Sequence, residues 1–300
     1  MIPSAAQDQN LATIKASTLI ESLPWLQEFH DKIVVIKFGG NAMVDQDLQR
    51  AFAQDMAYLR WVGIKPVVVH GGGPQISARL QELGIQSEFK GGLRVTTDQS
   101  IQVVRDVLRN QISQELAGLI NEAGAETVIL SGEDQNLFKA VKSYLQTPDG
   151  PVDIGHVGEV TTVNPRVVLD ALNDGKIPVI STVAPDVEGQ LYNVNADLAA
   201  AALAVAFGAE KLLVLTDVAG LYSDWPNQDS LVSEISTSEL ETLIPRLESG
   251  MIPKMQACLH AVKGGVPRAH VIDGRTPHSI LLEIFTVSGV GTLVLPDSSR

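Results

Sequence analysis

Two stretches decide the fold of this chain: Ile33-Val34-Val35-Ile36-Lys37-Phe38-Gly39-Gly40 and Pro66-Val67-Val68-Val69-His70-Gly71-Gly72-Gly73. Each is an apolar, β-branched run, typical of a strand that is buried on both faces of a sheet. Each ends directly in glycines, and a helical pattern follows. Glycines between a strand and a helix let backbone N–H groups and a helix N-terminus face an anion, most often a phosphate. Two such loops predict an enzyme that handles phosphates.

Length and composition restrict the class of protein. The 300 residues are 45% apolar, enough for one large α/β domain or two smaller ones. No apolar run reaches the roughly 18 residues of a membrane helix, and residues 1–10 lack the features of a signal peptide. A single cysteine, Cys258, excludes an internal disulfide and fits a reducing cytoplasm. The net charge of −13 argues against nucleic acid and anionic membranes as partners.

Strand-like and helix-like patterns alternate along the chain. Strands are expected at 33–38, 66–71, 126–131, 178–182, 212–217, 269–272 and 292–296, with helical patterns at 46–62, 74–83, 98–121 and 196–207. This alternation predicts an α/β fold with a mainly parallel sheet and helices on both faces. Residues 139–165 read as a hairpin outside that pattern, and Gly208 as a boundary between two lobes.

An N-terminal extension, residues 1–30, precedes the first predicted strand. Residues 11–30 carry a partial helical stripe of apolar side chains, interrupted at Pro24. The helix could pack on its own subunit, or it could be an arm that pairs with another subunit. The residues leave both alternatives open.

The two glycine loops each have a competing interpretation. Lys37 could place a cation against a phosphate at Gly39 and Gly40, or it could be an edge-strand lysine that reaches solvent. The loop 70–73 resembles the oxyanion-hole loop of some α/β-hydrolases, but those enzymes need a G-x-S-x-G motif, which this chain lacks. Walker A and dinucleotide-binding motifs are absent as well. The hydrolase interpretation is therefore set aside.

Three later segments carry further polar groups. Residues 192–197 lead into an alanine-rich helix, which either Asn195 or Asp197 could cap. Asp197 could instead serve chemistry. Residues 213–222 form a buried strand that ends in a polar turn, a suitable rim for a nucleotide. Residues 250–254 open a helix with a second lysine, Lys254, which could also be a solvated surface residue.

This combination resembles the amino acid kinase family, and within it the members that act on N-acetyl-L-glutamate. The resemblance spans residues 31–296 and rests on segments 37–40, 70–73, 92–96, 193–197, 215–217 and 251–254. It implies an open αβα sandwich with a mainly parallel central sheet. The N-terminal lobe, residues 31–207, would bind the acetylated amino acid, and the C-terminal lobe, residues 208–300, would bind ATP.

The resemblance also implies roles for individual residues in phosphorylation of a γ-carboxylate, which is already ionised at pH 7 and needs no general base. Lys37 and Lys254 would flank the transferred phosphoryl group, and Asp197 would hold both lysines. The implied substrate contacts are Gly40, Gly72, Gly73, Arg94 and Asn193. The implied nucleotide contacts are Asp217, Val218, Gly220, Leu221, Tyr222, Gly250 and Met251. Mg²⁺ would arrive with ATP, without a metal site of the protein's own.

The extension resembles the N-terminal helix of family members that are inhibited by arginine, in which such helices link three dimers into a hexamer. Residues Lys211, His270, Glu283 and Gly289 match the arginine-site pattern. Glu283 lies in an apolar strip, where a carboxylate needs a cationic partner. That partner could be the guanidinium of a ligand or a cation of the protein itself. The resemblance implies a cytoplasmic homo-oligomer, a trimer of dimers, inhibited by L-arginine.

The sequence departs from the usual family pattern at two places near the implied sites. Glu133 and Gln135 stand where lysine and glycine are common, and Ser249 stands where glycine is usual. A sister kinase for aspartate, glutamate or carbamate remains an alternative, as does a non-catalytic arginine-sensing scaffold. The retained Lys37, Asp197 and Lys254 argue against the scaffold.

Overall fold

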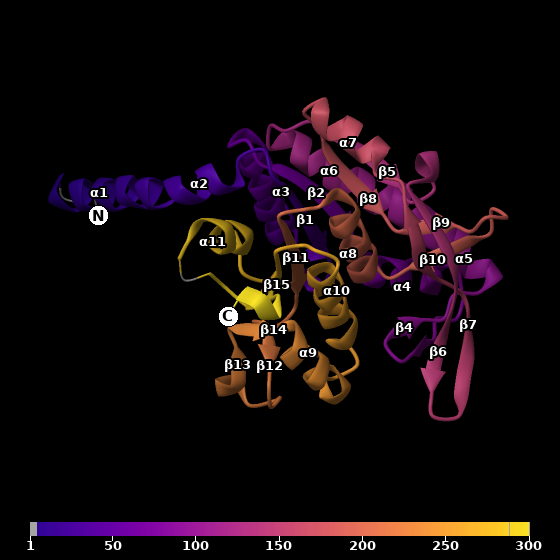
Figure 1. The fold of residues 1–300 in the computed structure, drawn as a ribbon. Coiled ribbons are helices and arrows are strands. Elements are labelled where there is room, and N and C mark those ends of the chain that lie inside the picture. The colour runs from indigo at the N-terminus through magenta and orange to yellow at the C-terminus, as the bar shows by residue number, and fades with distance from the viewer. Residues whose placement is uncertain (1–4, 288, 300) are drawn as a thin grey trace.

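A mainly parallel sheet forms the centre of the computed structural model, which describes residues 5–287 and 289–299 (Figure 1). Its eight strands, in spatial order, are β14 (Glu234–Ser236), β16 (Thr292–Leu295), β15 (Arg268–Asp273), β11 (Lys211–Thr216), β1 (Ile33–Phe38), β2 (Lys65–His70), β8 (Ile177–Ser181) and β5 (Thr127–Ser131). Neighbouring strands run parallel except β15 and β16. All seven predicted strands are present. β14 was not predicted, because three residues are too few for a recognisable pattern.

Helices cover both faces of this sheet. One face carries α7 (Arg166–Asn173), α8 (Ala196–Phe207) and α10 (Ile252–Lys263), and the other carries α3 (Gln46–Trp61), α4 (Gly73–Glu82), α6 (Ser113–Glu122) and α11 (Ser279–Phe285). Side chains of β1 alternate between these faces, as strand geometry requires. Val34 and Ile36 pack with α3, whereas Val35 packs with α8. Lys37 shares the parity of Val35 and therefore lies on the α8 side.

Smaller elements surround the central sheet. The predicted hairpin is present as β6 (Phe138–Thr147) and β7 (Gly150–Val163), joined in a second sheet by β10 (Leu191–Val194) and β9 (Val183–Pro185). Two short hairpins are β3 (Phe89–Lys90) with β4 (Leu93–Arg94), and β12 (Leu221–Tyr222) with β13 (Leu231–Val232). The remaining helical segments are α5 (Asp98–Asp106), α9 (Thr237–Leu243) and the turns η1 (Gly40–Met43), η2 (Val107–Ile112), η3 (Asp134–Asn136), η4 (Gln228–Ser230), η5 (Ile244–Arg246) and η6 (Asp297–Ser299).

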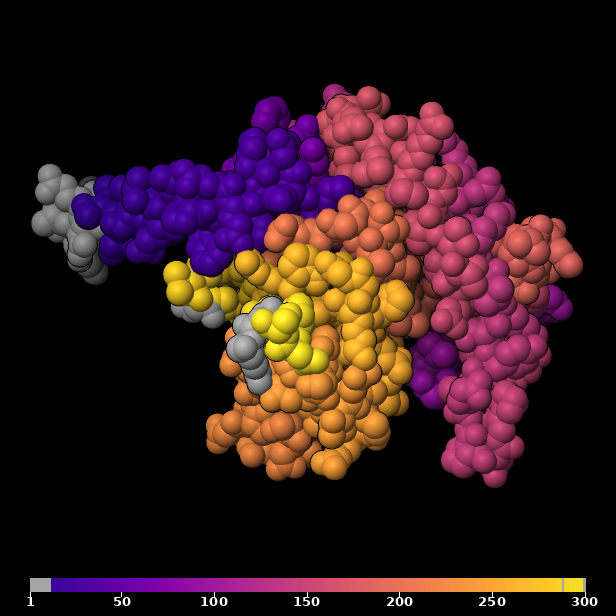
Figure 2. Space-filling view, in the orientation of Figure 1, coloured from indigo at the N-terminus to yellow at the C-terminus, as the bar shows by residue number. Residues whose placement is uncertain are grey.

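The predicted extension is helical and projects from the body of the molecule (Figures 1 and 2). It comprises α1 (Ala5–Glu21) and α2 (Leu23–Phe29), while residues 1–4 lie outside the described residues. Phe29 is buried, but every described side chain from 12 to 21 is exposed, Ile20 by 70%. Thus α2 packs on its own chain, and α1 presents apolar side chains to solvent. Among the described residues, none of the helices combines the length and apolarity needed to cross a membrane.

A buried carboxylate on α3 joins the segment before α11. The Asp55 carboxylate lies 2.6 Å from Nδ1 of His278, and Asp55 is 1% exposed. Burial raises the pKa of Asp55 to about 6, although the hydrogen bond from His278 acts to lower it. Since the folded pKa is raised, the favourable contribution of Asp55 to stability is complete below pH 4 and is lost as the pH rises through 6.

We therefore expect Asp55→Asn to stabilise the protein at pH 8, by up to about 3 kcal/mol, and to have little effect at pH 4. An asparagine oxygen can still accept the hydrogen bond from His278 but needs no charge in the buried site. Urea unfolding of both proteins at pH 4 and pH 8 measures the difference. A variant that is less stable than the parent at pH 8 contradicts this expectation.

Candidate active site

The glycine loops lie side by side because their strands are neighbours. β1 lies between β2 and β11, and in a parallel arrangement the carboxyl ends of all three strands meet at one edge of the sheet. That edge carries Gly39 and Gly40 after β1, residues 71–73 after β2 and Asp217 after β11. The backbone N–H of Gly71 donates to the carbonyl of Phe38 over 3.0 Å, so the two loops are joined directly.

Two lysines from distant parts of the chain meet at one carboxylate. Nζ of Lys37 lies 3.0 Å from Oδ1 of Asp197, and Nζ of Lys254 lies 3.5 Å from Oδ2 of Asp197. Lys37 is 6% exposed, which excludes the interpretation that it reaches solvent, and Asp197 is 4% exposed. The Lys254 side chain is 21% exposed and paired with Asp197, so it is not a freely solvated surface residue. Burial acts to raise the pKa of Asp197, but the charges of Lys37 and then Lys254 outweigh it and keep the pKa below its usual value.

The N-terminus of α8 explains why Asp197 is available to the lysines. Oδ1 of Asn195 accepts hydrogen bonds from the backbone N–H groups of Asp197 and Leu198, over 2.8 and 3.1 Å. Asn195 is thus the helix cap, as one of the two alternatives predicted. The Asp197 carboxylate is free of that role and pairs with the lysines instead.

Two glycines after β1 lie directly against charged side chains. A Cβ at Gly39 would lie 2.3 Å from Nζ of Lys37, and a Cβ at Gly40 would lie 2.6 Å from Oδ1 of Asp217. Gly40 also has φ +75°, a conformation that side chains other than glycine rarely adopt. Oδ1 of Asp217 accepts a hydrogen bond from the N–H of Asn41 over 2.8 Å. Asp217, predicted as a nucleotide contact, therefore also holds the first glycine loop.

Arg94 connects the hairpin β3–β4 to the second glycine loop. Its guanidinium donates to the carbonyl of Gly73 and to Oγ of Ser77, both over 2.8 Å, and also to Ser87. The ring of Phe89 lies 4.5 Å from the guanidinium carbon. Arg94 is 7% exposed, so the predicted substrate contact is a buried cation at the N-terminus of α4.

Asn193 lies on β10 beside the same hairpin. Its side-chain amide donates to Oγ1 of Thr96 over 3.3 Å, and Thr96 is fully buried. Thr96 belongs to the predicted segment 92–96, although its contact with Asn193 was not predicted, and Ser77 and Ser87 were not predicted to be part of this region. Their hydroxyl groups give no recognisable local pattern, since their partners come from other segments.

The predicted nucleotide residues divide into two groups. Leu221 is fully buried, and its N–H donates to Oγ1 of Thr292 over 2.8 Å, so it supports the polar turn from within. A Cβ at Gly220 would lie 2.7 Å from the same hydroxyl. Of the others, Val218, Tyr222 and Met251 are partly exposed, and Gly250 is exposed.

The departures from the family pattern have visible local consequences. Glu133 lies 2.8 Å from Nε of Arg105, an ion pair on the surface of α5. Gln135 has φ +50°, the left-handed conformation for which glycine is the usual residue. The carbonyl of Ser249 lies 3.2 Å from the position of a Cβ at Gly92, so the hairpin β3–β4 touches the loop that precedes α10.

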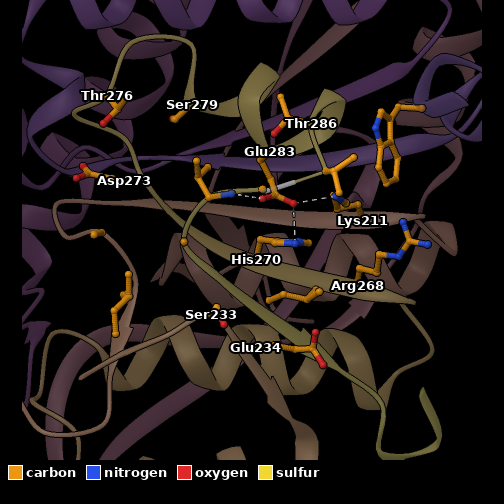
Figure 3. Close-up of a pocket in the computed structure, with 18 of the residues that line it drawn as sticks. Lys211, Ser233, Glu234, Arg268, His270, Asp273, Thr276, Ser279, Glu283 and Thr286 are labelled. Atoms are coloured by element: carbon orange, nitrogen blue, oxygen red, sulfur yellow. Dashed lines mark hydrogen bonds and ion pairs between the residues drawn. The ribbon is translucent and has the colours of Figure 1, made fainter. Parts of the chain in front are cut away.

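A cavity of about 920 Å³ lies apart from the lysine pair, between α2, β15 and α11 (Figure 3). Its lining includes the four residues predicted for arginine: Lys211, His270, Glu283 and Gly289. The Glu283 carboxylate lies 2.6 Å from Nε2 of His270 and 3.1 Å from Nζ of Lys211, and it accepts a hydrogen bond from the N–H of Val290. Of the two alternatives for Glu283, the ion pair within the protein is therefore observed.

Burial controls the charges in this cavity. It acts to raise the pKa of Glu283, but His270 and then Lys211 outweigh it and lower the pKa. Burial lowers the pKa of Lys211 and of His270. Nδ1 of His270 is buried without a hydrogen-bond partner among the described residues. Gly289 has φ +55°, and a Cβ there would lie 2.9 Å from Oε2 of Glu283.

An open, mainly parallel sheet with two glycine loops and a lysine–aspartate–lysine group at its strand ends is the arrangement expected of a phosphoryl-transferring kinase. The chain belongs to the amino acid kinase family, whose model matches residues 32–273. Proteins named acetylglutamate kinase are similar to it over nine-tenths or more of their length. The protein from Saccharopolyspora erythraea is 61% identical over 95% of this chain and 94% of its own, and that from Nocardioides sp. is 62% identical over 94% and 90%. The predicted enzyme class is confirmed.

Solved structures confirm the predicted fold. The N-acetylglutamate synthase from Neisseria gonorrhoeae, complexed with coenzyme A and N-acetyl-glutamate, superposes with a TM-score of 0.81 at 23% identity. The alignment covers 94% of this chain but 63% of the synthase. Carbamate kinase from Giardia lamblia bound to AMP-PNP has a TM-score of 0.60 at 20% identity, over 89% of this chain and 99% of that one.

Proposed function

We propose that this chain transfers the γ-phosphoryl group of ATP to the γ-carboxylate of N-acetyl-L-glutamate, a reaction of arginine biosynthesis. The observation that carries the proposal is the buried Lys37–Asp197–Lys254 group beside two glycine loops. The similarity to proteins named acetylglutamate kinase supports the choice of substrate. The N-terminal lobe, 31–207, would hold the acidic substrate, and the C-terminal lobe, 208–300, the nucleotide.

The geometry suits a reaction between two anions. A carboxylate must approach a phosphoryl group that is itself negatively charged, so catalysis consists of alignment and charge neutralisation. Lys37 and Lys254 supply two cations, and Asp197 fixes both ammonium groups in place before substrate arrives. Gly40, Gly72 and Gly73 supply backbone N–H groups, while Arg94 and Asn193 bind the substrate.

Mg²⁺ is proposed to enter with ATP. Among the described residues no group of three or more His, Cys, Asp or Glu side chains could hold a metal. Lys37 and Lys254 at the strand ends would contact the phosphates of a nucleotide that arrives with Mg²⁺ already bound. Bound to the phosphates, Mg²⁺ would neutralise charge on the leaving group.

The proposal is tested by trapping the acyl phosphate with hydroxylamine. N-acetyl-L-glutamate, L-glutamate, L-aspartate and carbamate are compared as acceptors, the last by ADP release. Turnover with N-acetyl-L-glutamate alone supports the proposal. Turnover with one of the other acceptors retains the kinase but replaces the substrate, and no turnover with any of them favours the scaffold alternative.

Arg94 is expected to control substrate affinity. We expect Arg94→Lys to raise KM for N-acetyl-L-glutamate by about 10- to 100-fold with a smaller change in kcat, because a lysine cannot form the bidentate contact of a guanidinium. Arg79→Lys, an exposed residue of α4 that pairs with Glu82, is the matched control. A KM that is unchanged in Arg94→Lys removes this residue from substrate binding.

We further propose that the cavity beside α11 binds L-arginine as a feedback inhibitor. It is large enough for an amino acid and contains a carboxylate for a guanidinium and cations for an α-carboxylate. Lys211 and Arg268 are the cations, and Glu283 is the carboxylate. Nδ1 of His270, buried without a partner among the described residues, is a further polar group that a ligand could satisfy.

We also propose that α1 links dimers into a hexamer. Ile14, Leu19 and Ile20 are 55%, 64% and 70% exposed, which favours a partner over solvent. Deletion of residues 1–21 leaves α2 and its contact between Glu28 and Arg268 in place. We expect this variant to sediment as a dimer and to respond more weakly to arginine. An unchanged hexamer, or a parent that is itself a dimer, contradicts the proposal.

A further inference from the structure

His70, which precedes the second glycine loop, makes two buried hydrogen bonds that have no role in the reaction proposed above. His70 and Ser113 are both fully buried. Nδ1 of His70 lies 2.9 Å from the carbonyl oxygen of Gly71, and Nε2 lies 2.7 Å from Oγ of Ser113. Ser113 follows η2, a turn with π-helical hydrogen bonding. Such turns are uncommon and are frequent at functional sites.

The partners of the imidazole determine which nitrogen carries the proton. Burial lowers the pKa of His70 to about 4, so the ring is neutral at pH 7 and has one proton. The carbonyl of Gly71 can only accept, and therefore the proton lies on Nδ1. Nε2 must then accept from the hydroxyl of Ser113. The hydroxyl of Ser113 also lies 3.0 Å from the carbonyl of Leu108. Its single proton goes to Nε2, because two acceptors would otherwise face each other over 2.7 Å, and the carbonyl of Leu108 keeps the backbone N–H of Ser113.

Holding the carbonyl of Gly71 also orients the next N–H group. The carbonyl of Gly71 and the N–H of Gly72 belong to one planar trans peptide unit and point in opposite directions. Because the carbonyl faces His70, the N–H of Gly72 faces away from it. Glycines on both sides make rotation of this peptide unit easy. A rotated unit would present a carbonyl oxygen, instead of a donor, to an incoming anion.

The turn η2 supports the same loop by contact. A Cβ at Gly72 would lie 2.4 Å from Cδ1 of Ile112 and 2.7 Å from Cδ2 of Leu108. The loop is thus bounded by η2 on one side, while Gly71 is tied to β1 through the carbonyl of Phe38. The remaining freedom is rotation of the Gly71–Gly72 peptide unit, which the hydrogen bond from His70 opposes.

We propose that His70, with its second ring nitrogen satisfied by Ser113, is a positioning residue for phosphoryl transfer: it holds the Gly71–Gly72 peptide so that the N–H of Gly72 donates to the transferred phosphoryl group. This inference rests on the proposed kinase function. A donor aimed at developing charge contributes roughly 10²- to 10³-fold to kcat. The effect should therefore appear in kcat more than in KM for either substrate.

The test compares variants that differ in where they place a donor. An asparagine amide can occupy the place of Nδ1, whereas a glutamine amide reaches the place of Nε2. We expect His70→Gln to lower kcat by about 10²-fold and His70→Asn by less than about 10-fold, with similar KM values. Ser113→Ala should lower kcat about 3- to 10-fold, because Nε2 then has no partner and the ring is held less firmly against the carbonyl of Gly71. Ser22→Ala, a buried serine next to α2, is the control and should leave kcat unchanged.

A readout independent of activity accompanies these rates. The ¹⁵N shifts of the His70 ring in the full chain report which nitrogen is protonated, and we expect Nδ1. Protonation at Nε2, or equal losses of kcat in His70→Asn and His70→Gln, overturns the inference. If the parent transfers no phosphoryl group, the proposed function has failed instead. The protonated nitrogen measured by the ¹⁵N shifts then still tests the hydrogen bonds assigned to His70. If His70→Gln does not fold, Ser113→Ala provides the kinetic comparison.

Discussion

Lys37→Met is expected to lower kcat by about 10²- to 10³-fold while KM for both substrates changes little. Methionine keeps the apolar stem of the lysine but removes the cation that lies over Gly39. The charge on the transferred phosphoryl group would then face Lys254 alone. Hydroxamate formation at saturating ATP and N-acetyl-L-glutamate measures the loss. Lys65→Met is the matched control, because Lys65 lies on the neighbouring strand β2 and pairs with Asp31 at the surface.

The same variant also tests the structural role of the ion pair. Removing Lys37 leaves the buried Asp197 with one cationic partner, which destabilises the fold. Since the pKa of Asp197 is lowered in the folded protein, its contribution to stability is present above its usual pKa and is lost as the pH falls through the folded value. Adding Asp197→Asn to Lys37→Met should restore stability at pH 7 but not kcat. A Lys37→Met variant with near-normal kcat would remove Lys37 from the mechanism.

Glu283→Gln is expected to raise the concentration of arginine that gives half-inhibition by about 10- to 100-fold, with uninhibited kcat unchanged. Glutamine has nearly the same volume, but it cannot form charge-assisted hydrogen bonds with a guanidinium, which are worth about 1.5–3 kcal/mol. The reaction rate is measured against arginine concentration at fixed substrate. Glu241→Gln is the control, since Glu241 pairs with Lys263 on the surface, outside the cavity lining.

The contacts of Glu283 define what would contradict this prediction. In the structure its carboxylate pairs with Lys211 and His270, so a ligand guanidinium must compete with these groups or join them. If Glu283→Gln and the parent respond identically to arginine, the cavity is not the inhibitory site. If the parent is not inhibited at all, arginine is not its regulator. A lower kcat of Glu283→Gln without arginine would mean that the contacts of Glu283 help to hold the active site at the strand ends in its geometry.

The strands and glycine loops could be predicted because their information is local. Apolar β-branched runs that end in glycine specify buried parallel strands and the loops after them, and neighbouring residues suffice for this inference. Lys37 and Asp197 were likewise conspicuous, since each is a charge at the end of an apolar element. β14 could not be predicted in this way, because its three residues join the sheet only by pairing with β16, which is distant in the sequence.

The partners of these charges were decided by tertiary structure alone. Asp197 meets Lys37 because α8 packs on the face of the sheet to which Lys37 points, and this depends on contacts between residues far apart in the chain. Glu283 meets Lys211, and His70 meets Ser113, for the same reason. A carboxylate or imidazole in an apolar run predicts that some partner exists, because burying it alone is too costly. Which partner satisfies it depends on how the helices fold back onto the sheet.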